Sequence, residues 1–418
     1  MQYIITPPAH INTTIHLPAS KSISNRALIL SALSANAICP ENLSDCDDTA
    51  VIVKALAERP ATIDIQAAGT AMRFMTAYLS VSEGEHILTG TERMQERPIK
   101  ILVEALRFLG ADIEYVGKEG YPPLKIKGKR LEGGSIEVAG NVSSQYISAL
   151  LMIAPMLKNG LTLKLLDSIV SRPYIDLTLH VMHQYGIEAE WNDMETITIP
   201  SQTYEAMPYF VENDWTAASY WYEIITILND KESQIMLPGL FNGSRQGDAG
   251  IQYIFSLLGV KTTFSGDGQQ SQVCISRQQR QPTRLEYDFK NQPDLAQTLI
   301  ALCPLLNLPF RFTGLSNLRI KETDRVKAMK IEMEKLGYII YTKNDEEVVW
   351  DGERCVAQPL PIIDTYDDHR MAMAFAPLSI KLGRIGINHP EVVSKSYPNF
   401  WQDMQKAGFK ITPYTSND

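Results

Sequence analysis

Apolar and polar positions recur along this chain in blocks of similar length. Short apolar runs that are typical of strands begin near Ile38, Ile87, Leu161, Ile235, Phe310 and Ile385. Four of the five intervals between them are 74 or 75 residues. A period of that length exceeds the repeats of solenoid proteins and indicates a larger repeated unit.

Two helical patterns accompany most of these strands. One ends at a glycine, which supplies the left-handed conformation that commonly follows a helix; these glycines are Gly110, Gly186, Gly259, Gly337 and Gly408. The other is apolar on nearly all sides and is predicted to be buried; it starts near Ser20, Gly69, Ser143, Asp214, Asp294 and Asp367. Six units of strand and helix predict an α/β protein with helices packed inside sheets, grouped as two domains of three units.

Composition narrows the function. Lys and Arg number 39 against 48 Asp and Glu, a formal net charge of −9. A net acidic chain has no general nucleic-acid footprint, so any anion site must be a local concentration of basic residues. The five cysteines show no paired spacing, which favours reduced thiols in a cytosolic protein. Neither a signal peptide nor a membrane span is expected.

Polar residues gather where the buried helices begin. Helix capping explains one Ser, Thr or Asp at each start, but it does not explain Lys21 with Arg26, or Arg370, on otherwise apolar helices. If these starts face one cleft between the domains, they form a basic anion site. Arg97, Arg172 and Lys395 lie in equivalent loops of the repeat.

Residues 317–325 (NLRIKETDR) place Arg319, Lys321 and Arg325 among Glu322 and Asp324 at the start of a further helix. Exposed backbone N–H groups and the helix dipole favour anions there.

The available chemistry is that of cations, hydroxyls and two titratable carboxylates, Asp294 and Glu322. No nucleophile elbow, Walker loop or dinucleotide fingerprint is evident. His180 and His183 lie three residues apart on a predicted helix, and we interpret them as surface or core histidines rather than metal ligands. These residues suit a substrate with two or more anionic groups and proton transfer by carboxylate and lysine.

Seven motifs make the chain resemble the 3-phosphoshikimate 1-carboxyvinyltransferases, also called 5-enolpyruvylshikimate-3-phosphate synthases, nearly end to end. They are SKSISNR at 20–26, AGTAMR at 68–73, ERP at 96–98, SSQ at 143–145, KETDR at 321–325, DHRMAM at 368–373 and KSYP at 395–398. The resemblance implies the inverse-barrel type of fold, with repeated βαβαββ units and a two-stranded hinge. For this chain that means one domain over 14–211 and another over 1–13 plus 212–418. The hinge is expected near 11–20 and 210–214, and the active site in the cleft.

The reaction so implied transfers the enolpyruvyl group of phosphoenolpyruvate to the 5-hydroxyl of shikimate 3-phosphate and releases phosphate. The resemblance assigns shikimate 3-phosphate to Lys21, Ser22, Arg26, Ser143, Ser144, Gln145, Ser171, Asp294, Asn317 and Lys321. It assigns phosphoenolpyruvate to Lys21, Gly69, Arg97, Gln145, Arg325, Arg370 and Lys395. Asp294, Glu322 and Lys21 are the catalytic candidates, and the sequence leaves open which of them moves which proton. No metal, cofactor, nucleic acid or membrane is implied, and we expect a cytoplasmic monomer.

Two departures and three alternatives remain. Ala67 stands where the family usually has asparagine, and Leu318 where an aromatic residue is often found. The UDP-N-acetylglucosamine 1-carboxyvinyltransferases carry a reactive cysteine in the loop that reads TERMQER at 91–97 here, without cysteine. RNA 3′-phosphate cyclases need a catalytic histidine and a nucleotide site that have no counterpart among these motifs. A non-catalytic anion-binding relative is disfavoured by Asp294, Glu322 and Lys21.

Overall fold

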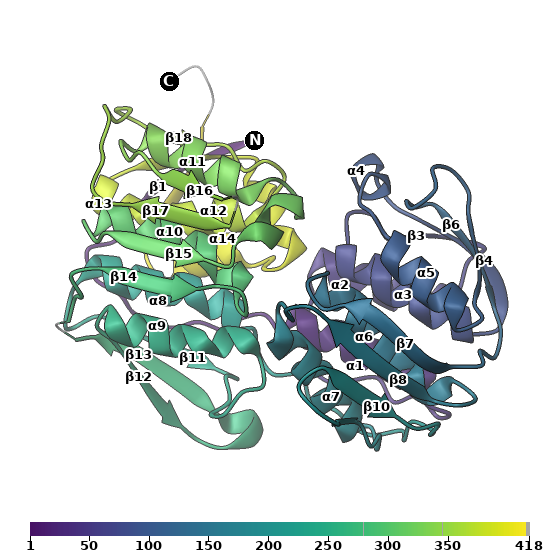
Figure 1. The fold of residues 1–418 in the computed structure, drawn as a ribbon. Coiled ribbons are helices and arrows are strands. Elements are labelled where there is room, and N and C mark those ends of the chain that lie inside the picture. Colours follow the sequence, from purple (N-terminus) through teal and green to yellow (C-terminus); the bar gives the residue numbers. More distant parts are fainter. Residues whose placement is uncertain (279, 345, 415–418) are drawn as a thin grey trace. The chain divides into compact units, whose positions relative to one another are not determined.

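The computed structural model describes residues 1–278, 280–344 and 346–414, which form two compact units (Figure 1). Unit 1 comprises Met1–Pro18 and Glu212–Asp418, and unit 2 comprises Ala19–Val211. The backbone N–H of Asp214 donates to the carbonyl of Pro18 at 2.9 Å. That hydrogen bond joins the two segments of unit 1 at the point where unit 2 is inserted.

Unit 2 contains two four-stranded sheets of the same topology. In spatial order, the first has β3 (Thr62–Asp64), β4 (Gly84–Thr89), β6 (Leu124–Gly128) and β5 (Asp112–Tyr115). The second has β7 (Gly134–Ala139), β8 (Leu161–Leu166), β10 (Thr196–Ile199) and β9 (Glu190–Trp191). In both, the first pair is parallel and the following pairs are antiparallel.

Unit 1 repeats this pattern in three sheets. One has β2 (Asn12–Thr14), β11 (Gln234–Pro238), β13 (Gln272–Arg277) and β12 (Val260–Ser265). Another has β14 (Leu285–Asp288), β15 (Phe310–Thr313), β17 (Glu347–Trp350) and β16 (Tyr341–Lys343). The third has β18 (Ile362–Ile363), β19 (Ile385–Asn388), β1 (Gln2–Thr6) and β20 (Lys410–Pro413). The N-terminal strand β1 thus lies between two C-terminal strands and is antiparallel to both.

The shared topology confirms the repeat, with one exception. The apolar runs near Ile87, Leu161, Ile235, Phe310 and Ile385 are β4, β8, β11, β15 and β19. The strand expected near Ile38 is wrong, because Ile38 is 40% exposed and outside every assigned strand. Pro40 follows two residues later and has no N–H for a ladder. Pairing in this segment is reduced to an isolated bridge between Glu41 and Phe210.

Each unit is built on three buried helices, as predicted. In unit 2 they are α1 (Lys21–Leu33), α3 (Gly69–Val81) and α6 (Ser144–Ile153), and in unit 1 α8 (Trp215–Leu228), α10 (Ala296–Leu305) and α12 (His369–Phe375). Side chains of Ser20, Ser143, Asp214 and Asp368 accept backbone N–H groups at the helix starts, which satisfies donors that have no partner within the helix. Buried side chains on most faces of these helices form the core of each unit.

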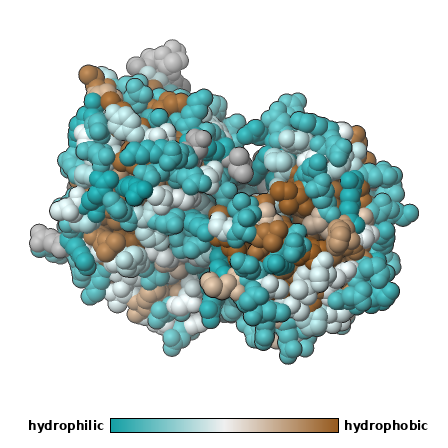
Figure 2. All heavy atoms as spheres, viewed as in Figure 1, coloured by the Kyte–Doolittle hydropathy of each residue, from teal (hydrophilic) through white to brown (hydrophobic). Residues whose placement is uncertain are grey.

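Further helices lie outside these buried ones and are amphipathic or short. They are α2 (Asp47–Glu58), α4 (Glu92–Gln95), α5 (Lys100–Phe108), α7 (Arg172–Gln184), α9 (Ile251–Leu257), α11 (Arg325–Lys335), α13 (Ser379–Leu382) and α14 (Phe400–Lys406). The glycines predicted to end α5, α7, α9, α11 and α14 all have φ between 80° and 103°. Hydrophilic residues cover much of the drawn face (Figure 2). Among the described residues, none of the helices has the length and hydropathy needed to cross a bilayer.

Candidate active site

The side chain of Arg325 joins three carboxylates in unit 1. Its Nε donates to Asp368 at 2.6 Å, its Nη1 to Asp294 at 2.9 Å and its Nη2 to Glu322 at 2.9 Å. Only 2% of the side chain is exposed. Because Arg325 is the first residue of α11, helix α11 fixes the position at which the three carboxylates meet. We call these four residues the Arg325 cluster.

Asp294 lies in a 3₁₀ turn, η4 (Pro293–Leu295), immediately before α10. Its second oxygen accepts a hydrogen bond from Nη2 of Arg370 at 2.8 Å, so two arginines hold this carboxylate. Burial alone would raise the pKa of Asp294, but the positive charges of Arg370, Lys321 and Arg325 outweigh it and hold the pKa well below its usual range. The carboxylate is therefore ionised and oriented.

Glu322 lies between α11 and a 3₁₀ turn, η5 (Ser316–Ile320). In addition to Arg325, it pairs with Nζ of Lys395 at 3.5 Å. Lys395 ends another 3₁₀ turn, η7 (Pro390–Lys395). Side chains of Glu322 and Lys395 are 15% and 13% exposed, so solvent reaches the pair only partly. The structure thus brings together five predicted site residues: Asp294, Glu322, Arg325, Arg370 and Lys395.

Arg370, in the first turn of α12, is 6% exposed. Its Nη1 donates to the phenolic oxygen of Tyr220, on α8, at 3.3 Å. Burial raises the pKa of Tyr220 to about 12, and the charge of Arg370 opposes that rise. Sequence reasoning missed Tyr220, because this residue lies in an apolar helix 150 residues away from Arg370.

Lys21 is the first residue of α1, in unit 2, and its Nζ pairs with Asp48 at 3.0 Å. The side chains are 17% and 6% exposed. Asp48 lies in the first turn of α2 and was missed by the sequence analysis. Acidic residues are common in first turns, so the residue type alone could not distinguish this partner.

Arg26, also on α1, is 3% exposed. It donates from Nε to Thr178 at 2.7 Å, from Nη1 to the Ser22 carbonyl at 2.8 Å, and from Nη2 to Ser148 at 3.0 Å and the Tyr174 carbonyl at 3.2 Å. Burial lowers its pKa to about 10. These four bonds engage four of the five N–H groups of a guanidinium, so Arg26 ties α1 to α6 and α7.

Gly69 and Arg97 lie against each other in unit 2. A Cβ atom at Gly69 would stand only 2.7 Å from Nη1 of Arg97, so the absence of a side chain permits this close approach. Arg73 donates to the carbonyls of Gly69 at 3.0 Å and Pro98 at 3.3 Å, which links the two loops. Nearby on α6, Nε2 of Gln145 donates to Thr70 Oγ1 at 3.0 Å.

The predicted serines stand at helix starts. Ser22 and Ser144 lie in the first turns of α1 and α6, and Ser143 caps α6 by accepting the Gln145 N–H at 3.3 Å. Ser171 precedes α7 with φ of +57°, a conformation that is uncommon for residues other than glycine. Helix N-termini favour anions, so these positions are compatible with a phosphorylated ligand.

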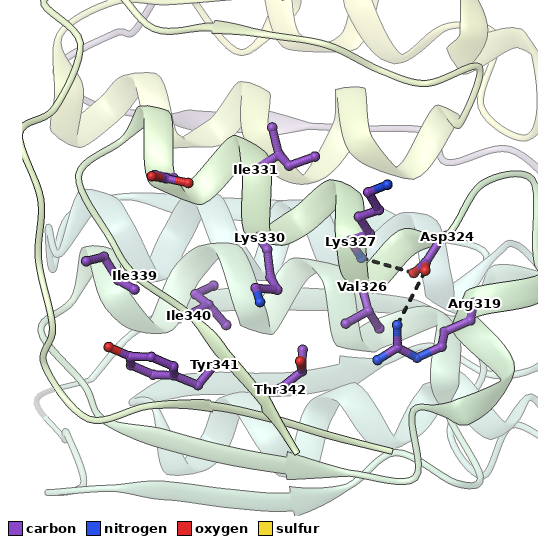
Figure 3. Close-up of a pocket in the computed structure, with 11 residues that line it drawn as sticks. Arg319, Asp324, Val326, Lys327, Lys330, Ile331, Ile339, Ile340, Tyr341 and Thr342 are labelled. Carbon is purple, nitrogen blue, oxygen red and sulfur yellow. Dashed lines mark hydrogen bonds and ion pairs between the residues drawn. The ribbon is translucent and has the colours of Figure 1, made fainter. Parts of the chain in front are cut away.

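The stretch 317–325 divides its charges between two sides. Arg319 donates to Asp324 at 3.4 Å, and both residues line a pocket of about 480 Å³ formed mainly by α11 and residues 339–342. Figure 3 shows Arg319 pointing toward Asp324 in this pocket. Lys321 acts instead on Asp294 through its charge. Asn317 is half-buried, and Leu318, where the family often has an aromatic residue, is 1% exposed and packs in the core.

Within the part of the chain that the structure describes, no group of three or more His, Cys, Asp and Glu side chains is arranged to hold a metal ion. His180 is half-buried and His183 exposed, both on α7. The charged site residues are instead matched to anionic groups, because forked guanidinium donors suit phosphate and carboxylate oxygens.

Comparisons with known proteins agree on one family. The family model described as EPSP synthase (3-phosphoshikimate 1-carboxyvinyltransferase) matches residues 5–59 and 54–404. A 3-phosphoshikimate 1-carboxyvinyltransferase of Bacteroides fragilis is 56% identical over 414 residues, 98% of this chain and 99% of that protein. One of Sulfurovum sp. is 34% identical, over 96% of this chain and 98% of that protein. The solved EPSP synthase of Acinetobacter baumannii is similar in fold, with a TM-score of 0.77 at 19% identity over 99% of this chain and 100% of that one.

Proposed function

The chain belongs to the EPSP synthase (3-phosphoshikimate 1-carboxyvinyltransferase) family, and on that premise we propose which residues bind each substrate and which transfer protons. The enzyme transfers the enolpyruvyl group of phosphoenolpyruvate to the 5-hydroxyl of shikimate 3-phosphate and releases phosphate, a step of the shikimate pathway to aromatic amino acids. The Arg325 cluster carries the proposed roles, because it holds two carboxylates suited to proton transfer. The cations that pair with those carboxylates, Arg325, Arg370 and Lys395, suit a phosphate.

We assign each substrate the residues predicted for it. Shikimate 3-phosphate is held by Lys21, Ser22, Arg26, Ser143, Ser144, Gln145, Ser171, Asp294, Asn317 and Lys321. Phosphoenolpyruvate is held by Lys21, Gly69, Arg97, Gln145, Arg325, Arg370 and Lys395. In support, Ser22, Ser143, Ser144 and Ser171 stand at helix N-termini, and a side chain at Gly69 would collide with the Arg97 guanidinium.

Glu322 is the proposed proton donor to C3 of phosphoenolpyruvate. Arg325 and Lys395 pair with Glu322, and both are also assigned to phosphoenolpyruvate. An incoming anion competes for these cations and adds negative charge beside Glu322, and both effects favour the protonated carboxyl. A protonated Glu322 can then donate to the C3 methylene, which leaves positive charge at C2.

Asp294 is the proposed acceptor of the proton of the 5-hydroxyl. Two arginines fix its oxygens and lower its pKa, so it is an oriented but weak base. Such a base can take the hydroxyl proton once the oxygen begins to bond to C2 and becomes acidic. In the second half of the reaction C3 returns its proton to Glu322, and the C–O bond to phosphate breaks. Lys21, which we assign to both substrates, remains a third candidate for proton transfer.

Acceptor choice tests the function directly. Phosphate release from phosphoenolpyruvate should occur with shikimate 3-phosphate and not with UDP-N-acetylglucosamine, because the loop at 91–97 lacks cysteine. Turnover with the nucleotide sugar alone would assign the chain to the other carboxyvinyltransferase family. No release with either acceptor would indicate a non-catalytic relative. We further propose that the enzyme is a cytoplasmic monomer, which sedimentation equilibrium can test for its mass of 46.9 kDa.

A further inference from the structure

A fourth carboxyl group, that of Asp248, is bound to α8 one helical turn before Tyr220, the residue that holds Arg370, and it has no part in the roles assigned above. Asp248 lies in a 3₁₀ turn, η2 (Gly247–Gly250), and is 3% exposed. Its Oδ2 accepts a hydrogen bond from the hydroxyl of Thr216, in the first turn of α8. Two residues before Asp248, the side-chain oxygen of Gln246 accepts a hydrogen bond from the backbone N–H of Trp215 at 3.2 Å. This bond holds the turn against the start of α8.

Thr216, which binds Asp248, and Tyr220, which binds Arg370, are four residues apart and so lie on one face of α8, which holds Asp248 and Arg370 about one helical turn apart. The groups whose charges act on Asp248 come from several elements. They are Asp294 on η4, Arg370 on α12, Asp214 at the start of α8 and Tyr287 on β14. Asp294 and Arg370 form an ion pair at 2.8 Å, so the charge of Asp248 acts on a pair that already belongs to the proposed site. Repulsion between two carboxylates is mutual: the charge of Asp294 opposes ionisation of Asp248, and an ionised Asp248 increases the proton affinity of Asp294 by the same amount.

We propose that Asp248 is a positioning residue that sets the basicity of Asp294. When Asp248 is neutral, Asp294 is stabilised as an anion by its two arginines and is a very weak base. When Asp248 is ionised, its negative charge raises the proton affinity of Asp294 and draws on the same Arg370. Asp294 then accepts the hydroxyl proton more readily. This inference rests on the proposed role of Asp294.

The ionisation of Asp248 falls in a range where it can matter. Burial and the charge of Asp294 raise the pKa of Asp248 to about 7, although the Thr216 hydrogen bond and Arg370 oppose the rise. Turnover of the wild-type enzyme should therefore increase as pH rises through neutrality. The effect acts on proton transfer, so it belongs to kcat rather than to the KM of either substrate.

Asp248→Asn removes this ionisation while keeping the shape of the side chain. The readout is the ratio of wild-type to variant kcat for phosphate release between pH 5.5 and 9, because the ratio cancels ionisations common to both enzymes. We expect a ratio near one at low pH that rises to about tenfold above pH 8, since one unit of pKa is a tenfold change in proton affinity. The KM values should stay within about twofold.

Thr216→Val provides the matched second variant. It keeps the Asp248 carboxylate but removes the hydrogen bond that stabilises its ionised form. In Thr216→Val, kcat should therefore increase by the same factor as in wild type, but the increase should occur at higher pH. A merely structural role predicts a different pattern, in which both variants lose the same activity at every pH.

The outcomes separate this inference from the proposed function. A flat ratio for Asp248→Asn, or an equal loss at all pH values, would overturn the role of Asp248 while leaving the reaction assignment intact. Near-normal turnover of Asp294→Asn would instead contradict the role of Asp294 on which the inference depends. If Asp248→Asn does not fold, the alkaline shift in Thr216→Val decides, because its absence also overturns the proposal.

Discussion

Replacing Arg325 by glutamine should destabilise unit 1 strongly. The substitution removes a guanidinium that is 2% exposed and that contacts Asp368, Asp294 and Glu322 at 2.6–2.9 Å. Removing one partner of a buried ion pair costs about 3–5 kcal/mol. Three such costs do not add here. Asp294 keeps Arg370, Glu322 keeps Lys395, and Asp368 keeps the backbone N–H of Arg370 at 2.9 Å. We therefore expect a loss of about 4 kcal/mol.

A matched control is available on the surface of the same unit. Arg311 donates twice to Glu347, at 2.8 and 2.9 Å, but its side chain is 48% exposed. Exposed ion pairs contribute little to stability because solvent screens them, so Arg311→Gln should lower the free energy of unfolding far less than Arg325→Gln does. The two substitutions are chemically identical and differ in burial.

Urea unfolding followed by tryptophan fluorescence suits this comparison. Four of the five tryptophans, at positions 215, 221, 350 and 401, lie in unit 1, so the signal reports mainly on its unfolding. The low pKa of Asp294 contributes stability above its unfolded pKa of about 3.9, and that contribution is lost as the pH falls. The difference in the free energy of unfolding between wild type and Arg325→Gln should therefore become smaller at acidic pH. This reasoning would be refuted if, at pH 7, Arg311→Gln lowered the free energy of unfolding about as much as Arg325→Gln.

Three further predictions concern other positions. Asp294→Asn and Glu322→Gln should each lower turnover roughly 10²-fold or more, and Glu322→Gln should keep its affinity for shikimate 3-phosphate. The control Glu334→Gln, at an exposed position on α11, should turn over as wild type does. Near-normal turnover of both Asp294→Asn and Glu322→Gln would contradict the proposed roles. The raised pKa of Asp248 means that its ionisation increasingly opposes folding as the pH rises from about 4 to about 7. In urea unfolding, the free energy by which Asp248→Asn exceeds wild type in stability should therefore grow over that pH range and stay constant above it. A stability difference that is constant from pH 4 to pH 8 would contradict this prediction. Ala67 is exposed and lies two residues before Gly69. Ala67→Asn should strengthen inhibition by glyphosate, which in this family occupies the phosphoenolpyruvate site. Glyphosate inhibition constants measured on both proteins test this, and unchanged or weaker inhibition of the variant would count against the prediction.

Local patterns predicted the fold well because local chemistry determines the features involved. The buried helices begin within two residues of the predicted starts, since capping groups and apolar runs are contiguous in sequence. The strand near Ile38 failed for the opposite reason. Its two apolar residues are followed by Pro40, and whether such a segment pairs depends on a partner as distant as Phe210.

The candidate site residues were chosen by residue type, and their contacts within the protein could not be predicted. The sequence placed Arg325 and Arg26 among ligand-binding residues, yet both side chains also make extensive buried contacts with protein groups. Those partners lie up to 152 residues away and are brought close only by the tertiary packing of different helices. Asp48 and Asp248 were missed for the same reason, because a single acidic residue near a helix start carries no distinctive spacing.

The position of β1 has a consequence for how the chain acquires its structure during synthesis. Among the strands that the structure describes, β1 is made before all the others, whereas its two neighbours, β19 and β20, are made after all the others. Unit 2 is continuous in sequence and can complete its core as soon as residue 211 has left the ribosome. Unit 1 must keep β1 unpaired until the final strand emerges, and closing so long a loop makes this sheet a late and slow event. Loss of the C-terminal strand therefore leaves an exposed strand edge in the first segment of the chain.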